Sequence, residues 1–440
     1  MTEEQKIYYE KNQYASLLHT PDGVRDIYNG ECRRKLRVQE QIHKVLKLYG
    51  FQDIQTPTFE FFDIFNKERG TIASREMYKF FDRDGNTLVL RPDMTPSIAR
   101  CAAKYFKEET MPLRLCYMGN TFINNNVHKG KLNEMTQIGA ELINDDTVDA
   151  DAEMIVMTVQ SLLDAGLKEF QVEVGHAGFL NGLMEECAFS WEEMLELKTL
   201  MESKNLFGVE EMVSSKKMKK EIKEVILNLP QLFGNIENIR YAKGKVKNEK
   251  ALQALERLEQ LYDIIEKYGV SEYVTFDLGM LSRYDYYSGI ILNAYTYGTG
   301  EAIVQGGRYD HLIGQFGKNA PAIGVAFVID QLLLALSRQK QFEDEEENAV
   351  LVVYEERQRE QAITLAKILR KEGKSTELLC KKQAVSLEEY KAYGHRIGLQ
   401  RIFILQGEEQ LSEIFLKDEM EITTSVSNLS KKGDEILCDI

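Results

Sequence analysis

Apolar residues recur at intervals of three to four positions in residues 31–49, where Val38, Ile42 and Val45 share one face. This spacing predicts an amphipathic helix, and Gly50 suits the position just after its C-terminal end. A second apolar pattern of helical period, in residues 149–167, predicts another amphipathic helix.

Between these two helices the pattern changes to alternating and β-branched runs, which are typical of strands. Residues 51–60 are predicted as one strand with Pro57 near its edge or end. A hairpin is predicted for residues 77–93, turning at Asp84-Gly85-Asn86. Thr95 is the expected N-cap of the helix that follows. Further strands are predicted at 113–122 and 134–143, and another is predicted at 170–176, just after the second helix.

From residue 178 to 268 the pattern becomes charged and helical, which predicts a helical insertion. Strand patterns return in 273–327, and an apolar helix follows at 328–339. The acidic segment 341–348 is predicted as a linker. After it, strand and helix patterns alternate, which predicts a small α/β domain with a mostly parallel sheet.

Together these elements predict an α+β fold, in which an antiparallel sheet is flanked by helices. The sheet is expected to come from two separate blocks of the chain, with the helical insertion between them. The expected domains are residues 1–177 and 269–340 for the two parts of the core, 178–268 for the insertion, and 348–440 for the C-terminal α/β domain.

Composition narrows the class of protein. The 440 residues carry a formal net charge of −15, which disfavours a broad polyanion-binding surface. The six cysteines are scattered without a Cys-x-x-Cys pair, so we expect a reducing, cytoplasmic location and no metal site. No apolar run approaches the ~18 residues of a membrane span, and no cofactor motif is present.

Three stretches carry a family resemblance. The segment YGFQDIQTPTFE resembles the dimer-forming first motif of class II aminoacyl-tRNA synthetases. The segments MYKFFDRDGNTLVLRPDMTPSIAR and YMGNTF…TQIGAELI resemble the second-motif region of histidyl-tRNA synthetase. The segment LSRYDYYSGIILNAY…GGRYDHLIGQFG…PAIGVAFVIDQL resembles its histidine-recognition segment and third motif. The resemblance implies a class II synthetase-like core and a homodimer formed through residues 31–60. More loosely, the C-terminal α/β domain, residues 348–440, resembles an anticodon-binding domain.

The resemblance fails at the residues that handle ATP. Ile123, Ser282 and Gln331 stand where the synthetases place arginines. Each charge-assisted contact with phosphate contributes roughly 1.5–3 kcal/mol. Losing all three would cost a factor of about 10³ or more in rate, so no adenylation activity and no catalytic residue is expected.

The amino-acid side of the pocket is retained. By the resemblance, Asp93 and Thr95 match the positions that hold the amino group of histidine. Gln137 and Glu141 match positions that contact its carboxylate and imidazole, and two tyrosines match the pair beside the ring. The histidine-binding residues implied in this way are Asp93, Thr95, Gln137, Glu141, Arg283, Tyr286 and Tyr287. Arg283 stands one position from the arginine that the synthetases use, where a strand side chain points to the opposite face.

The combination of RPDMTP at residues 91–96 with a degraded ATP site resembles one family in particular. These are the regulatory subunits of short-form ATP phosphoribosyltransferase, which are non-catalytic paralogues of histidyl-tRNA synthetase. The resemblance implies a hetero-oligomer with a short catalytic subunit, which catalyses the first step of L-histidine biosynthesis. It also implies allosteric activation of that subunit and a part in feedback inhibition by L-histidine.

Two alternatives stay open at this point. One is an active histidyl-tRNA synthetase with unusual motifs, and the other is a synthetase-like histidine sensor that serves another system. Residues 341–440 hold 14 Lys and Arg against 21 Asp and Glu, a poor surface for tRNA, so tRNA is not an expected partner. A gene for a short catalytic subunit beside this one would favour the regulatory interpretation.

Overall fold

The computed structural model describes residues 17–65, 72–125, 131–187, 189–203, 205–216, 218–280, 286–342, 349–382, 385–406, 410–418 and 420–425. The chain forms two compact units, Met1–Phe342 and Glu343–Ile440, and the break between them falls in the predicted linker. Among the described residues, no helix combines the length and the apolar character needed to cross a membrane.

The first unit is built on a nine-stranded sheet. Its neighbours are antiparallel except for the parallel pairs β1–β5 and β7–β9, so the predicted antiparallel sheet is confirmed. In spatial order the strands are β1 (Gln52–Asp53), β5 (Leu113–Phe122), β6 (Glu134–Ile143), β12 (Ala322–Val328), β11 (Val304–Arg308), β10 (Ile290–Thr296), β7 (Phe170–His176), β9 (Val274–Asp277) and β8 (Phe233–Gly234).

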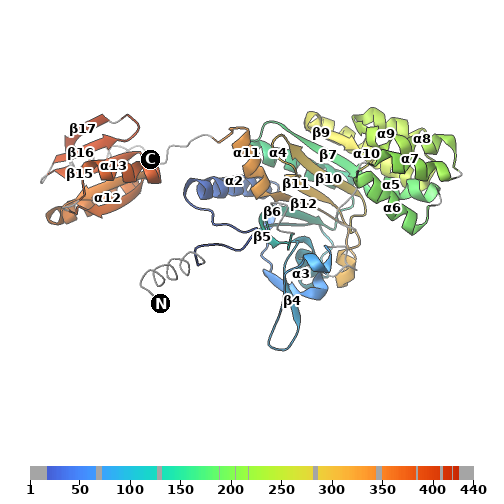
Figure 1. Ribbon diagram of the computed structural model, residues 1–440, viewed down its shortest axis with the longest axis horizontal. Helices are drawn as coiled ribbons and strands as arrows, with labels where there is room; N and C mark the ends of the chain where they lie inside the picture. The colour runs from blue at the N-terminus through green and yellow to red at the C-terminus, as the bar shows by residue number, and fades with distance from the viewer. Residues whose placement is uncertain are drawn as a thin grey trace, which may run out of the picture. The chain divides into compact units, whose positions relative to one another are not determined.

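Helices cover both faces of this sheet, as Figure 1 shows. One face packs against α2 (Asn29–Leu48), α4 (Val148–Asp164) and α11 (Ile329–Arg338). The other packs against α3 (Thr95–Tyr105) and the short helix η7 (Ile313–Phe316). On β5 the side chains alternate, because Cys116 joins the α2 face while Leu115 and Tyr117 join the α3 face.

Two predicted details near the start of the chain are wrong. The strand predicted for residues 51–60 is two short strands, since β1 belongs to the large sheet and β2 (Phe59–Phe61) to another. Between them, Arg91 donates to the carbonyls of Thr56 and Pro57 at 2.8 and 3.3 Å, so this backbone pairs with a side chain.

Thr95 is also not an N-cap. It already lies inside α3, whose N-cap is Met94. The backbone N–H of Thr95 donates to Asp93 Oδ1 at 3.2 Å, and its hydroxyl donates to Glu141 instead of the helix backbone. The Thr95 hydroxyl, which the sequence alone predicts to cap the helix, therefore makes a tertiary contact with Glu141.

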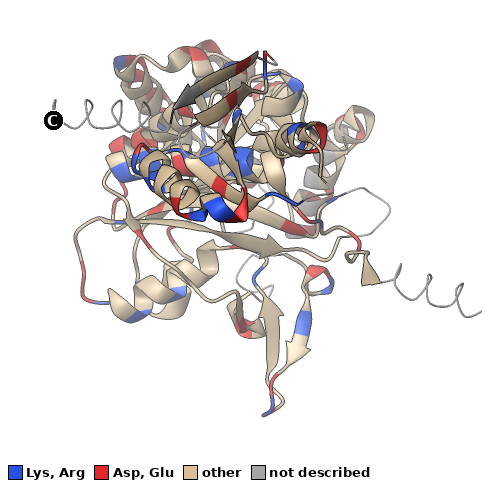
Figure 2. Ribbon diagram, turned by 90° about the vertical axis from the view of Figure 1, so that its left-hand side faces the viewer, with Lys and Arg blue, Asp and Glu red and all other residues tan. Residues whose placement is uncertain are grey.

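The predicted hairpin is confirmed as β3 (Lys79–Phe81) and β4 (Thr87–Leu90), which join β2 in a three-stranded sheet. Gly85 takes a φ of +82° in the turn, and the Asp82 carboxylate accepts from the backbone of Asp84 and Asn86. Figure 2 shows this hairpin projecting from the body of the unit. One face of the small sheet packs on a core that includes Phe65, Met77 and Val89, while the other exposes phenylalanines.

The segment predicted as an insertion is helical and gathers at one end of the large sheet (Figure 1). Its helices are α5 (Ala177–Glu186), α6 (Trp191–Glu202), α7 (Leu206–Ser215), α8 (Lys220–Asn228), α9 (Ile236–Lys243) and α10 (Glu249–Tyr268). The apolar side chains of these helices share one continuous core with α2, α4 and the sheet. The domain boundaries at 177 and 268 stay predictions.

A buried ion cluster joins α10 to α4 and β11. Asp151 of α4 has no exposed surface and accepts hydrogen bonds from two arginines. Arg257 Nε donates to Asp151 Oδ2 at 2.7 Å, and Arg308 Nε donates to Asp151 Oδ1 at 2.9 Å. These contacts brace the helical segment and α4 against the sheet.

The second unit has a five-stranded sheet in the order β14 (Ser375–Cys380), β13 (Ala349–Tyr354), β15 (Arg401–Gln406), β16 (Gln410–Phe415) and β17 (Met420–Ser425). Helices α12 (Arg359–Lys371) and α13 (Leu387–Ile397) pack on separate cores of this sheet. The first three strands pair in parallel as predicted. The last two were not predicted and pair antiparallel, so the sheet is mixed and not mostly parallel.

Candidate functional site

Six of the seven predicted histidine-binding residues line one cavity on the α3 face of the large sheet. They are Asp93, Thr95, Gln137, Glu141, Tyr286 and Tyr287. Arg283 lies outside the described residues, so its contact with a ligand carboxylate stays a prediction. Asp93 and Thr95 come from the start of α3, and Gln137 and Glu141 come from β6, where an even spacing places both on one face.

Glu141 lies at the centre of the hydrogen bonds in this cavity. Its side chain is buried, and Thr95 Oγ1 donates to its Oε1 at 3.0 Å. The Tyr309 hydroxyl donates to its Oε2 at 2.5 Å. Burial raises the pKa of Glu141 to about 8, and the nearby Asp93 carboxyl adds to the effect. Glu141 is therefore a neutral acid at pH 7, and its own O–H can donate to a nitrogen of a ligand.

Asp93, the second acid of the cavity, accepts hydrogen bonds at both of its carboxylate oxygens. The hydroxyl of Tyr286 donates to Asp93 Oδ2 at 3.0 Å, and the backbone N–H of Thr95 donates to its Oδ1. The rings of Tyr286 and Tyr287 meet edge to face, with centroids 4.9 Å apart. The described lining residues include no Lys or Arg, so the acid side of the cavity suits a cationic group such as an ammonium.

Gln137 has a hydrogen-bond acceptor that a ligand bound in this cavity could satisfy. Its Oε1 is buried and has no hydrogen-bond partner among the described residues. A buried polar atom without a partner costs roughly 1–3 kcal/mol, so most native structures avoid one. An N–H or O–H of a bound molecule would satisfy this oxygen.

The sequence interpretation missed several lining residues, including Tyr117, Gln305 and Tyr309. Tyr309 donates directly to Glu141 and is fully buried between the sheet and α3. One signal could have found it, because Gln305 and Gly307 of β11 and Tyr309, the residue just after that strand, alternate with residues that point to the other face. Arg308, between Gly307 and Tyr309, points to that other face, where it contacts Asp151.

Gly324 of β12 lies opposite Glu141 of β6 in the strand register. A Cβ at position 324 would lie 1.7 Å from Glu141 Oε2, so only glycine leaves room for the acid. The free space in the cavity is about 20 Å³, which holds about one water molecule and not an amino acid. A ligand of the size of histidine therefore needs side chains of the lining to move.

The burial of Glu141 predicts a pH dependence of stability. Its pKa is about 8 in the folded chain against 4.5 for an exposed Glu, so the acid costs stability as pH rises through this range. At pH 7 the cost reaches about 3 kcal/mol, at about 1.4 kcal/mol per pH unit. We expect Glu141→Gln to recover up to that amount at pH 7 and to flatten the profile between pH 5 and 8.

Urea unfolding at pH 5, 6, 7 and 8 measures this difference. Glu134→Gln, on the same strand, is the matched control for replacing a carboxyl by an amide. If the free energies of unfolding of wild type and Glu141→Gln stay parallel across this range, Glu141 is ionised in the folded chain and the assignment is wrong.

The positions of two missing arginines lie in a second, larger cavity. Ile123 and Gln331 line a space of about 820 Å³ between the β5–β6 end of the sheet and α11. Gln331 Nε2 donates to Glu301 Oε2 at 3.5 Å, and Lys131 forms an ion pair with the same carboxylate. A carboxylate beside the expected place of a triphosphate opposes phosphate binding.

Only some of the other charged groups around this cavity are in ion pairs. Arg25 contacts Glu31 at 2.6 Å, and Asp330 contacts Lys35 at 3.1 Å and accepts from the backbone N–H of Thr136 at 2.7 Å. Arg34 instead lies over the ring of Phe342, and Arg338 donates to the backbone carbonyl of Gly298. The cavity therefore has arginines in its lining, but not at positions 123 and 331, where the synthetases place them.

Comparison with known proteins shows which class of protein has this sequence pattern and this fold. The chain matches the family model described as histidyl-tRNA synthetase over residues 23–332. A histidyl-tRNA synthetase structure from a Nostoc species has the same fold, with a TM-score of 0.78 at 17% identity, over 94% of this chain and 99% of that one. The protein is therefore histidyl-tRNA synthetase-like.

Curated relatives define the class more narrowly. A protein of Acetivibrio thermocellus named ATP phosphoribosyltransferase regulatory subunit is 40% identical over 361 residues, which cover 82% of this chain and 86% of the relative. A solved structure described as an ATP phosphoribosyltransferase regulatory subunit/histidyl-tRNA synthetase from Bacillus halodurans has a TM-score of 0.80 at 32% identity, over 89% of this chain and 99% of that one. The chain belongs to the family of ATP phosphoribosyltransferase regulatory subunits.

Proposed function

We propose that this chain is a non-catalytic subunit that activates a short-form ATP phosphoribosyltransferase catalytic subunit and takes part in its inhibition by L-histidine. One observation carries the proposal. The residues that match histidine recognition converge on one cavity, while the positions that would serve ATP hold Ile123 and Gln331. The family of its relatives supports the same role.

The chemistry of the small cavity suits histidine. The ligand's ammonium would pair with Asp93, whose carboxylate already accepts from Tyr286 and Thr95. The imidazole would lie between Glu141 and the tyrosines, because a neutral acid and phenols can serve both ring nitrogens. The buried Gln137 Oε1 would accept a hydrogen bond from the ligand.

A direct test uses the full chain together with a short catalytic subunit. Co-purification of the two, followed by an assay of phosphoribosyl transfer with and without histidine, measures binding, activation and inhibition separately. The proposal predicts that the catalytic subunit is more active in the complex and that histidine inhibits the complex. A chain that neither binds nor activates the catalytic subunit would refute it.

The absent arginines predict that the chain has no adenylation activity. In the presence of histidine, exchange of pyrophosphate into ATP should fall by a factor of about 10³ or more below that of a synthetase. The comparison is a histidyl-tRNA synthetase assayed in parallel at equal concentration. Exchange at a synthetase-like rate would instead favour the enzyme alternative.

We also propose a homodimer through residues 31–60. In this segment Leu36, Leu48 and Phe59 are exposed by more than half, with values of 59, 75 and 52%, and Phe61, the next residue after the segment, is 55% exposed. Phe59 and Phe61 lie on one face of β2, and the Phe59 ring meets Phe80 edge to face at 5.7 Å. Exposed apolar groups that lie together, as these phenylalanines do, mark an interaction surface.

Phe61→Asp is therefore expected to weaken the dimer by at least about tenfold, because it places a charge in an apolar contact. Multi-angle light scattering over a dilution series measures the change. Phe233→Asp, on the exposed edge strand β8, is the control for adding a charge to a surface aromatic. A wild-type chain that is monomeric at micromolar concentration would refute the interface.

A further inference from the structure

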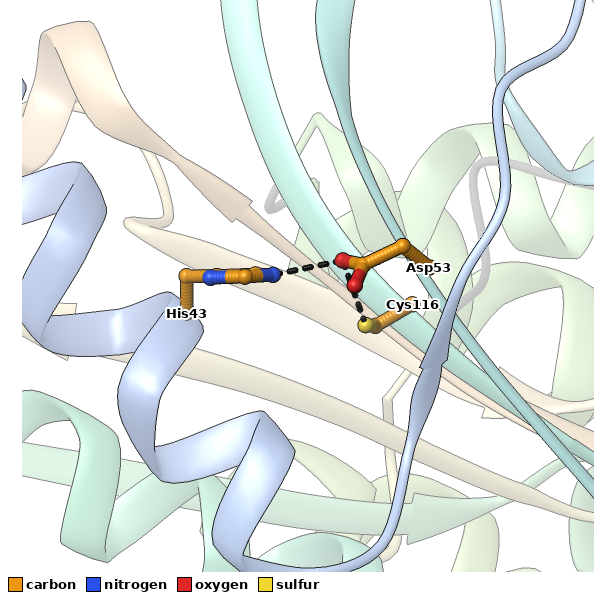
Figure 3. Close-up of side chains that lie close together, drawn as sticks. All are labelled: His43, Asp53 and Cys116. Atoms are coloured by element: carbon orange, nitrogen blue, oxygen red, sulfur yellow. Dashed lines mark hydrogen bonds and ion pairs between the residues drawn. The ribbon is translucent and has the colours of Figure 1, made fainter.

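A histidine, an aspartate and a cysteine from three different elements lie together where α2 packs on the large sheet (Figure 3). His43 Nε2 and Asp53 Oδ1 are 2.5 Å apart, and Cys116 Sγ donates to Asp53 Oδ1 at 3.5 Å. One ligand atom from each side chain lies within 4.8 Å of the other two.

The sheet register and the helix packing bring these side chains together. Asp53 and Cys116 are direct partners in the parallel pair β1–β5, so both point to the face that α2 covers. His43 projects from α2 toward this edge of the sheet. Cys116 is fully buried, whereas the Asp53 side chain is 58% exposed, so in a single subunit the cluster is open on the Asp53 side.

We propose that His43, Asp53 and Cys116 form a binding site for Zn²⁺ or a divalent cation with the same ligand preference. An imidazole nitrogen, a carboxylate oxygen and a thiolate sulfur are the three ligand types that Zn²⁺ accepts in proteins. Mg²⁺ and Ca²⁺ require oxygen ligands, so this donor set excludes them. Water would complete the tetrahedron at the exposed side.

The spacing of the donors suits such an ion with a small adjustment. Metal–ligand bonds of about 2.0–2.3 Å place neighbouring donors of a tetrahedron roughly 3.3–3.7 Å apart. The Asp53–Cys116 pair already has that spacing, and the His43–Asp53 pair would open by about 1 Å. The His43 and Cys116 donors, which lie within 4.8 Å of each other, would approach by up to about 1 Å. Binding would break the His43–Asp53 hydrogen bond and release the thiol proton of Cys116 to solvent.

A neighbouring lysine opposes the cation. Lys47, one turn after His43 on α2, holds Asp53 Oδ2 at 3.0 Å. Its ammonium competes with a metal ion for the same carboxylate and repels it. Removal of the Lys47 charge should therefore strengthen metal binding, whereas loss of any of the three ligands should weaken it. Because the Lys47 variant and the ligand variants should change the metal affinity in opposite directions, they distinguish this site from unspecific binding.

The experiment uses the full reduced chain, freed of metal with a chelator and titrated with Co²⁺, with Zn²⁺ as competitor. Thiolate bonding to Co²⁺ gives a near-ultraviolet charge-transfer band, and tetrahedral Co²⁺ gives strong visible bands. We expect one equivalent per chain, displaced by Zn²⁺. His43→Gln and Cys116→Ser should weaken binding by at least about tenfold, and Cys116→Ser should abolish the charge-transfer band.

Lys47→Met should bind several times more tightly than wild type. Cys101→Ser, in the cysteine of α3 outside the cluster, should leave the titration unchanged. His43 is partly exposed, so its variant tests the site even if the Cys116 variant folds poorly. The proposal is overturned if wild type shows no thiolate band, if the band survives in Cys116→Ser, or if His43→Gln and Lys47→Met bind like wild type.

Discussion

A complex assembled with the Glu141→Ala variant is expected to require roughly 10- to 100-fold more histidine for inhibition than the wild-type complex. The substitution removes the acid that Thr95 and Tyr309 hold in the cavity, and with it the proposed imidazole partner. Leaving the buried imidazole nitrogen of the ligand without this partner costs about 1–3 kcal/mol. Activation of the catalytic subunit should persist, because its contact with this chain need not involve the cavity.

A histidine titration of the reconstituted complex measures this shift. Asp93→Asn should act in the same direction through the ammonium, and Glu134→Ala, earlier on the strand that carries Glu141, is the matched control. If both cavity variants are inhibited at the wild-type histidine concentration, histidine is sensed elsewhere. The cavity would then be an inherited relic or a part of the activating route only.

Asp151→Ala is expected to lower the free energy of unfolding by about 3–5 kcal/mol, since it leaves two arginines without their shared buried partner. Of its partners among the described residues, Arg308 would keep backbone carbonyls and the partly exposed Asp310, and Arg257 would keep backbone carbonyls. This cluster joins α10 to the sheet, so the loss should destabilise the whole first unit.

Urea unfolding of the full chain, followed by a probe of the first unit such as the fluorescence of Trp191, measures the effect. Asp149→Ala removes an exposed acid from the first turn of the same helix and controls for the change of charge there. A loss below about 1 kcal/mol would mean that the arginines find other partners and that the cluster is dispensable.

The pattern of the sequence predicted most long elements because they follow a clear period. The helix around Val38 and the antiparallel strands β5 and β6 were expected within a few residues of their bounds. The division into β1 and β2 was missed, since it depends on Arg91, which is distant in sequence and takes the carbonyls of Thr56 and Pro57. Nor does local pattern alone say which of two sheets a short strand joins.

Some residues of the candidate site were predicted from the sequence, and others were missed. Asp93, Gln137 and Glu141 were expected from the resemblance to histidyl-tRNA synthetase, and the structure brings them to one cavity. Tyr309 was missed because its role depends on the pairing of β11 with β12, which sets the face it occupies. The cluster of His43, Asp53 and Cys116 was also invisible in sequence, since no local spacing relates its members.

The close approach of Glu141 and Gly324 limits how this pocket can evolve. A side chain at position 324 would force the acid out of its present position, where Thr95 and Tyr309 hold it, so substitutions at the two positions are coupled. A lineage that loses the acid frees position 324 to acquire a side chain that fills the vacated space. The residues at positions 141 and 324, considered together, should therefore distinguish relatives that still bind a ligand in this cavity from relatives that retain only the fold.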